Sequence, residues 1–298
     1  MEDIVTIETR AAERRPSLFS AYVELTKPRI TLLVVLTAAA GYCLGSKGAF
    51  SPSRFALMSA SIALLSSGIS TLNQYIEREL DGLMNRTRHR PLPAGKLGPA
   101  RALGFGVALS LAGIASLAVF ISLLTAALGL LTLAAYLFAY TPLKTRSSLS
   151  TVVGAFPGAM PPLIGWAAAR GTVGIEAWIL FAILFLWQFP HFLAIAWMYR
   201  DDYARAGIRM LPVVEPEGRV TGQQILTYTL MLIPVSMLPT MVHLTGNVYM
   251  LGALVLGTLF LFFSVRAAVV RSAWQARRLL QASVLYLPAL FVLMVLNP

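Results

Sequence analysis

The stretch that decides the fold is 102–143, ALGFGVALSLAGIASLAVFISLLTAALGLLTLAAYLFAYTPL, which contains no charged side chain. A membrane-spanning helix needs roughly 20 apolar residues. This stretch is therefore long enough for two such helices, and we expect the chain to turn back near Leu123–Thr125. An uncharged run of this length is not expected in a soluble fold.

Uncharged runs recur along the rest of the chain. They cover 30–46, 55–76, 147–169, 177–199, 220–265 and 279–298. The run 220–265 has room for two helices with a break near Gly246–Asn247, and the other five hold one helix each. Only 12% of the 298 residues are charged, about half the usual share in soluble domains. The sequence predicts an all-α polytopic membrane bundle of about nine transmembrane helices.

The basic residues predict the orientation of the bundle. With the N-terminus inside, 21 of the 24 Lys and Arg residues fall on the cytoplasmic side, and only Lys47, Arg54 and Arg170 fall opposite. Cytoplasmic loops of membrane proteins carry such an excess. We therefore expect a cytoplasmic tail at 1–26, a transmembrane domain at 27–298 and the inner (cytoplasmic) membrane as location. The net charge of +11 then needs no nucleic-acid partner, because topology and the lipid bilayer explain it.

Several predicted spans contain proline, at positions 157, 161, 162, 190, 234 and 239. Proline within a span frees backbone groups, which is tolerated where that backbone is buried in protein or lines a cavity. We expect the helices to surround a central cavity.

Three oxygen-bearing side chains close the second predicted helix. Asn73, Glu77 and Asp81 are spaced by four, so they lie on one stripe of the helix at the membrane boundary. Mg²⁺ is commonly held by one or two carboxylates together with substrate phosphates. Taken alone, such a stripe also fits acids in the headgroup zone, paired with Arg78 or Arg86.

The next stretch favours the metal interpretation. Asn85-Arg86-Thr87-Arg88-His89-Arg90 brings three arginines directly after the carboxylates. Guanidinium groups bind phosphate oxygens, so the two stretches together predict a site for a metal-bridged diphosphate. Lys144, Arg146 and the segment Lys27-Pro28-Arg29 add basic groups on the same side of the membrane.

These motifs resemble those of the UbiA superfamily of intramembrane prenyltransferases. Asn73-x₃-Glu77-x₃-Asp81 resembles that family's NxxxDxxxD motif, with Glu in the middle place, and Tyr140-x₃-Lys144 resembles its YxxxK motif. Four further motifs, in the same order, are similar to those of the family's protohaem IX farnesyltransferase group. They are Asn85–Leu92, Gly158–Trp166, Trp187–Phe192 and Asp201–Pro212.

The resemblance implies a reaction and the residues that serve it. Farnesyl diphosphate and haem B are the implied substrates and haem O the product, with a haem A synthase or oxidase assembly proteins as the implied partners. The residues implied to take part fall into three sets. The catalytic set is Asn73, Glu77, Asp81, Tyr140 and Lys144; the Mg²⁺ ligands are Asn73, Glu77, Asp81, Asp201 and Asp202; the diphosphate ligands are Arg86, Arg90, Lys144 and Arg146.

The chain departs from the family at one point. The family's second motif is DxxxD, but Met198 stands four residues before Asp202, and Trp197 stands four before Asp201. The usual ligand set of a second metal site is therefore incomplete.

His191 lies in the middle of a predicted span. A buried histidine is often a hydrogen-bonded structural residue, and that alternative stays open here. The implied haem substrate favours a second interpretation, in which His191 is an axial ligand of the haem iron.

Two other functions also fit the sequence. A UbiA-type enzyme acting on an aromatic acid or quinone precursor shares the same diphosphate chemistry. A transporter would also have many helices with breaks, but its binding site is expected at the membrane midplane. Here the ionisable residues gather at one face of the membrane.

Overall fold

A computed structural model describes residues 17–46 and 48–297, and every regular element in this part of the chain is helical. Nine of these described helices are long and apolar enough to cross a membrane, which confirms the expected number. They are α3 (Pro28–Ser46), α4 (Pro52–Ile76), α6 (Pro99–Ser116) with η1 (Leu117–Ile121), α7 (Leu123–Ala134) with η2 (Ala135–Tyr140) and α8 (Thr141–Leu143), α9 (Ser150–Arg170), α10 (Ile175–Met198), α13 (Arg219–Met241), α14 (Asn247–Val270) and α15 (Ala273–Leu296).

Both long uncharged runs break where the sequence indicated. In the first run, Ser122 is extended, and its hydroxyl accepts a hydrogen bond from the backbone N–H of Thr125 at 3.2 Å. This cap satisfies one of the free N–H groups at the start of α7. In the second run, Gly246 precedes the first residue of α14, Asn247.

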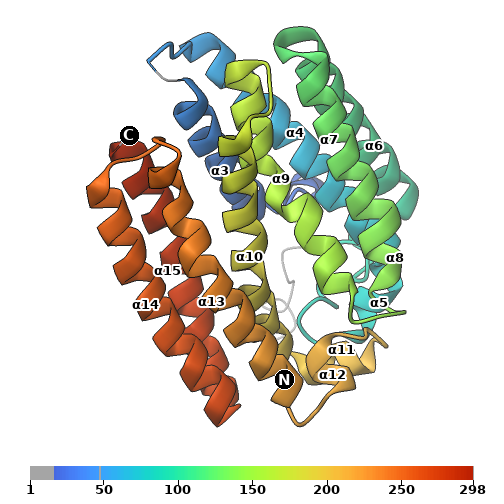
Figure 1. Cartoon of the computed structure of the whole chain (residues 1–298). Helices are drawn as coiled ribbons and strands as arrows, with labels where there is room; N and C mark the ends of the chain where they lie inside the picture. The colour runs from blue at the N-terminus through green and yellow to red at the C-terminus, as the bar shows by residue number, and fades with distance from the viewer. Residues whose placement is uncertain (1–16, 47, 298) are drawn as a thin grey trace, which may run out of the picture.

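The spanning helices form three groups (Figure 1). The helices α13, α14 and α15 lie on one side, α4, α6 and α7 lie on the other, and α3, α9 and α10 stand between them. Among the middle helices, α9 and α10 are the most enclosed. In their apolar stretches 67% of the residues are buried, against 22–50% in the other spans. They are therefore the core of the bundle, and each of them contains proline.

Glycine lets α3 and α9 approach closely. A Cβ added at Gly165 of α9 would collide with the backbone oxygen of Ala38 in α3, and one added at Gly41 would collide with that of Pro162. Small residues at such positions allow helix backbones to touch, which provides packing energy inside a membrane. This close contact fixes the middle of the bundle.

Four further short helices occur in the described part of the chain. They are α2 (Leu18–Leu25), α5 (Arg78–Leu83), α11 (Arg200–Arg205) and α12 (Leu211–Val214). The last three lie together at one end of the bundle (Figure 1). Of the expected tail 1–26, residues 1–16 lie outside the described residues. Its final part is the helix α2, where Leu25 is fully buried and its carbonyl accepts a hydrogen bond from Gln74.

Candidate active site

The predicted stripe spans the junction between α4 and α5. Glu77 interrupts the helix, with φ −91° and ψ 7°, yet the backbone hydrogen bonds continue through it. The N–H of Glu77 donates to the carbonyl of Asn73 at 2.9 Å, and the N–H of Asp81 donates to that of Glu77 at 2.8 Å. The three residues therefore stay one turn apart, and their exposed fractions are only 2%, 7% and 1%.

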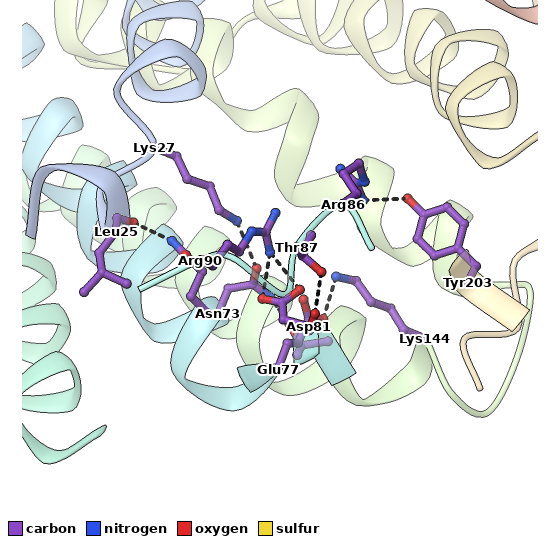
Figure 2. Close-up of polar contacts among 12 residues, drawn as sticks. Leu25, Lys27, Asn73, Glu77, Asp81, Arg86, Thr87, Arg90, Lys144 and Tyr203 are labelled. Carbon is purple, nitrogen blue, oxygen red and sulfur yellow. Dashed lines mark hydrogen bonds and ion pairs between the residues drawn. The ribbon is translucent and has the colours of Figure 1, made fainter. Parts of the chain in front are cut away.

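Each member of the stripe has its own cationic partner (Figure 2). Lys27 Nζ donates to Asn73 Oδ1 at 3.3 Å, and Lys144 Nζ lies 2.6 Å from Glu77 Oε1. Arg90 Nη1 donates to both carboxylate oxygens of Asp81, at 2.8 and 2.7 Å. Lys27 and Lys144 approach the stripe from opposite sides. Two buried carboxylates and an amide thus face three cations.

The surroundings of the two lysines shift their pKa values in opposite directions. Burial lowers the pKa of Lys27 to about 7, with a further decrease from the charges of Arg90 and Lys144. Burial also acts to lower the pKa of Lys144, but the acidic groups of Tyr140 and Glu77 outweigh it and raise that pKa above its ordinary value. Lys144 is therefore held as a cation.

A widened helical turn brings Lys144 to the stripe. The segment η2, which ends at Tyr140, is π-helical, a geometry often found at functional sites. The Lys144 ammonium lies 4.5 Å from the centre of the Tyr140 ring. One turn earlier, the Thr141 hydroxyl donates to the carbonyl of Tyr136 and accepts a hydrogen bond from Asn73 Nδ2 at 3.4 Å. Tyr140 and Lys144 of the YxxxK motif thus lie in the cluster.

Asp202 links the short helix α11 to the segment that follows α5. Its carboxylate accepts hydrogen bonds from the backbone N–H groups of Asn85, at 3.4 Å, and Arg86, at 3.2 Å, and it also pairs with Arg205. The Arg86 guanidinium lies 5.0 Å from the centre of the Tyr199 ring. Asp202 therefore positions the loop of residues 85–90, the arginine loop, and Arg86 is exposed at its start.

Other predicted site residues lie outside the cluster. The Asp201 side chain, assigned from the second motif, is 88% exposed and lies 3.7 Å from Arg200. The physical reason is that Asp201 and its neighbour Asp202 point in different directions on the short helix α11, and only Asp202 is buried. Arg146 is exposed to solvent.

His191 lies on α10 and contacts α15. Its Nδ1 is 2.8 Å from the hydroxyl of Ser283, and its ring stacks on Trp187 with centroids 4.6 Å apart. The structure therefore places His191 in a polar contact within the bundle core.

Sequence reasoning did not assign two residues that contact the stripe. Lys27 precedes Pro28 at the start of the first span and has a left-handed backbone with φ 47°, which allows its side chain to reach Asn73. The signal in the sequence was its basic charge on the same side of the membrane as the stripe, beside a helix-starting proline. Thr141 carried no signal beyond its place in the motif Tyr140–Lys144.

The donor set of the stripe fits a magnesium ion. Among residues 17–46 and 48–297, no three His, Cys, Asp or Glu side chains gather as a metal site, so the candidate set is two carboxylates and one amide. Mg²⁺ takes oxygen ligands, and typically only one or two protein carboxylates, because waters and phosphates complete its shell. The neighbouring basic side chains suit the phosphates.

The fold and the cluster define an intramembrane prenyltransferase: the chain belongs to the UbiA prenyltransferase family, whose model matches residues 34–294. A protoheme IX farnesyltransferase of Solibacter usitatus is 52% identical, covering 93% of this chain and 98% of the relative. That of Koribacter versatilis is 46% identical, over 94% of each chain. A UbiA homologue from Archaeoglobus fulgidus, solved with GPP and Mg²⁺, has a TM-score of 0.63 at 15% identity, covering 92% of this chain and 99% of its own.

Proposed function

We propose that this chain transfers the farnesyl group of farnesyl diphosphate to a vinyl group of haem B, with addition of water, giving haem O. Relatives with this activity in their name match nearly the whole chain, at 52% and 46% identity. The observation that carries the proposal is the buried cluster itself, in which Glu77 and Asp81 are paired with Lys144 and Arg90. Its carboxylates supply negative charge for the metal ion, and its cations supply positive charge for the diphosphate.

In this proposal Asn73, Glu77 and Asp81 hold Mg²⁺, which neutralises charge on the departing diphosphate when bound. Lys144 and Arg90 exchange their carboxylate partners for phosphate oxygens, while Arg86 and Arg146 bind from the rim. These cations stabilise the charge that develops as the C1–O bond breaks. Tyr140 holds the Lys144 ammonium against its ring and so keeps it aimed at the phosphate.

The bond changes then follow from substrate chemistry. The electron pair of the C1–O bond leaves with the diphosphate, and an allylic farnesyl cation remains. The π electrons of the haem vinyl group form the new C–C bond. Water adds to the resulting cation beside the porphyrin ring and loses a proton, which leaves a hydroxyethylfarnesyl chain. Burial of the cluster limits the water that would otherwise capture the farnesyl cation.

His191 is proposed as an axial ligand of the haem iron, because neutral imidazole is a common iron ligand.

The sequence motif that contains Asp201 and Asp202 gives less support to a second metal site. Asp201 is exposed, and Asp202 accepts two backbone hydrogen bonds. Asp202 is proposed to position the arginine loop.

The remaining proposals concern location and partners. The 21 basic residues on one side support an N-terminus in the cytoplasm and, for a bacterial cell, the inner membrane. A soluble diphosphate then enters from the cytoplasmic end, where the cluster lies. A haem A synthase or oxidase assembly proteins are the proposed receivers of the product.

A single turnover experiment tests the proposal. Purified protein is incubated with Mg²⁺, farnesyl diphosphate and either haem B or 4-hydroxybenzoate, and the products are weighed by mass spectrometry. We expect haem B to gain one farnesyl group and one hydroxyl, and 4-hydroxybenzoate to remain unchanged. Prenylation of 4-hydroxybenzoate alone would replace the proposed acceptor, and no prenylated product from either would contradict the proposed enzyme. A transporter, in contrast, would move its substrate across the membrane and leave it chemically unchanged.

A further inference from the structure

The side chain of His191 is held by one residue of a neighbouring helix. Ser283 of α15 is fully buried, and its hydroxyl lies 2.8 Å from His191 Nδ1. The backbone carbonyl of the same residue accepts a hydrogen bond from Trp187 Nε1 at 2.9 Å. His191 and Trp187 are one turn apart on α10, and their rings are stacked. Ser283 therefore fixes both rings from across the helix interface.

The hydroxyl of Ser283 has a second contact, which decides the direction of the hydrogen bond to His191. It lies 2.6 Å from the carbonyl oxygen of Leu280, one turn earlier on α15. A carbonyl oxygen can only accept, and a serine hydroxyl has a single proton to donate. The proton must lie between Ser283 and Leu280, because two acceptors would otherwise face each other at 2.6 Å in a buried place.

It follows that the Ser283 oxygen accepts from His191. Nδ1 of His191 carries the proton, and in the neutral ring Nε2 is then the nitrogen with a free lone pair. Within the described part of the chain, Nε2 has no hydrogen-bond partner, and His191 is partly exposed. Trp187 covers one face of the ring, and Phe192 meets it at 65° with centroids 5.4 Å apart. The ring is thus fixed in both tautomer and orientation.

Metal-bound histidines characteristically donate their second ring N–H to a neighbouring acceptor, which fixes the tautomer and strengthens the ligand. We propose that Ser283 is a positioning residue that holds His191 as its Nδ1–H tautomer, so that Nε2 is presented to the iron of the haem substrate. This inference rests on the proposed function, because it takes haem B as the molecule that His191 binds.

The test compares two porphyrins that differ only in the iron. Haem B and iron-free protoporphyrin IX are titrated into purified full-length protein and into its S283A variant, and binding is followed by absorption, with electron paramagnetic resonance for the haem. We expect S283A to weaken haem B binding about 10–100-fold and to leave protoporphyrin IX binding unchanged. The S283T variant, which keeps a hydroxyl, should restore the haem signal.

A matched control comes from Ser264 of α14, which is equally buried and shares a hydrogen bond of 2.9 Å with Thr229. The S264A variant removes the same atom from a serine that bonds to Thr229 and not to His191, so haem B should bind to it as to the unaltered protein. Equal weakening for both porphyrins in S283A would mean a packing role and would overturn the inference. So would an unchanged haem spectrum and affinity in S283A.

The H191A variant separates this inference from the proposed function. Loss of the histidine-ligand signature in H191A, with no change in S283A, would leave His191 as a ligand and reject only the role of Ser283. An unchanged spectrum in H191A would reject iron ligation by His191, and the inference with it. Farnesyl transfer is measured independently by mass spectrometry, so a failure of the reaction would appear there while the binding spectra remained intact.

Discussion

Replacing Lys144 by methionine separates the structural role of the buried ion pair from its role in the reaction. The Lys144 and Glu77 side chains are only 13% and 9% exposed, and their charged atoms are 2.6 Å apart. Removing one partner of a buried pair leaves the other charge without compensation, at a cost of about 3–5 kcal/mol. Because both groups lie near the end of the bundle, we expect K144M to lower the free energy of unfolding by about 3 kcal/mol.

The double variant E77Q/K144M removes both charges and should recover most of that loss, to within about 1 kcal/mol of the unaltered protein. Thermal unfolding in detergent measures both variants. One kcal/mol corresponds to about 2–4 °C in a chain of this size class, so the single variant should melt about 6 °C or more below the unaltered protein. The control is E79Q. The Glu79 side chain is 84% exposed, so this substitution should change the melting temperature little.

Activity should not follow stability in this series. Both K144M and E77Q/K144M lack the cation proposed to bind the diphosphate, so neither should turn over farnesyl diphosphate at a measurable rate. A stable and fully active double variant would refute the assignment of Lys144 and Glu77 to the site. A double variant as unstable as K144M would refute the reasoning from an uncompensated charge.

Three further predictions follow from the same structure. D81N should reduce turnover by ~100-fold or more while the protein stays folded by thermal unfolding; full activity would reject the metal role of Asp81. G165A should destabilise the bundle by about 3 kcal/mol, at the upper end for overpacking, because the added carbon meets backbone of Ala38; G104A, with nothing within 4 Å, should be neutral or slightly stabilising. Chelation of divalent ions should abolish turnover, and Mg²⁺ in excess should restore it; activity that survives chelation would show that no dissociable metal is needed.

The fold could be predicted because the membrane restricts the choices. A run of uncharged residues in lipid must satisfy its backbone hydrogen bonds internally, which leaves the helix as the solution. The two long runs were also divided near the correct residues, since Ser122 and Gly246 are polar or flexible points in otherwise apolar sequence. What the sequence could not reveal was which helices are central, because the mean hydropathies of α9 and α10, 1.3 and 2.0, fall within the range of 1.3–2.2 of the other spans.

The site was predicted in part. The spacing of Asn73, Glu77 and Asp81 placed them on one stripe, and the structure keeps them there through the interruption at Glu77. Sequence spacing gave no information on contacts between distant segments. The approach of Lys27 depends on its left-handed backbone, and the different surroundings of Asp201 and Asp202 depend on how α11 packs against the arginine loop. The expected central cavity and the boundary at residue 26 stay predictions.

Binding of farnesyl diphosphate without haem, measured by calorimetry with and without Mg²⁺, tests the central claim most directly. The unaltered protein should bind the diphosphate tightly only when Mg²⁺ is present, because Asn73, Glu77 and Asp81 are the proposed ligands of the ion. In D81N the affinity should be weak and nearly independent of Mg²⁺. If Mg²⁺ tightened binding to D81N as much as to the unaltered protein, the stripe would not be the metal site.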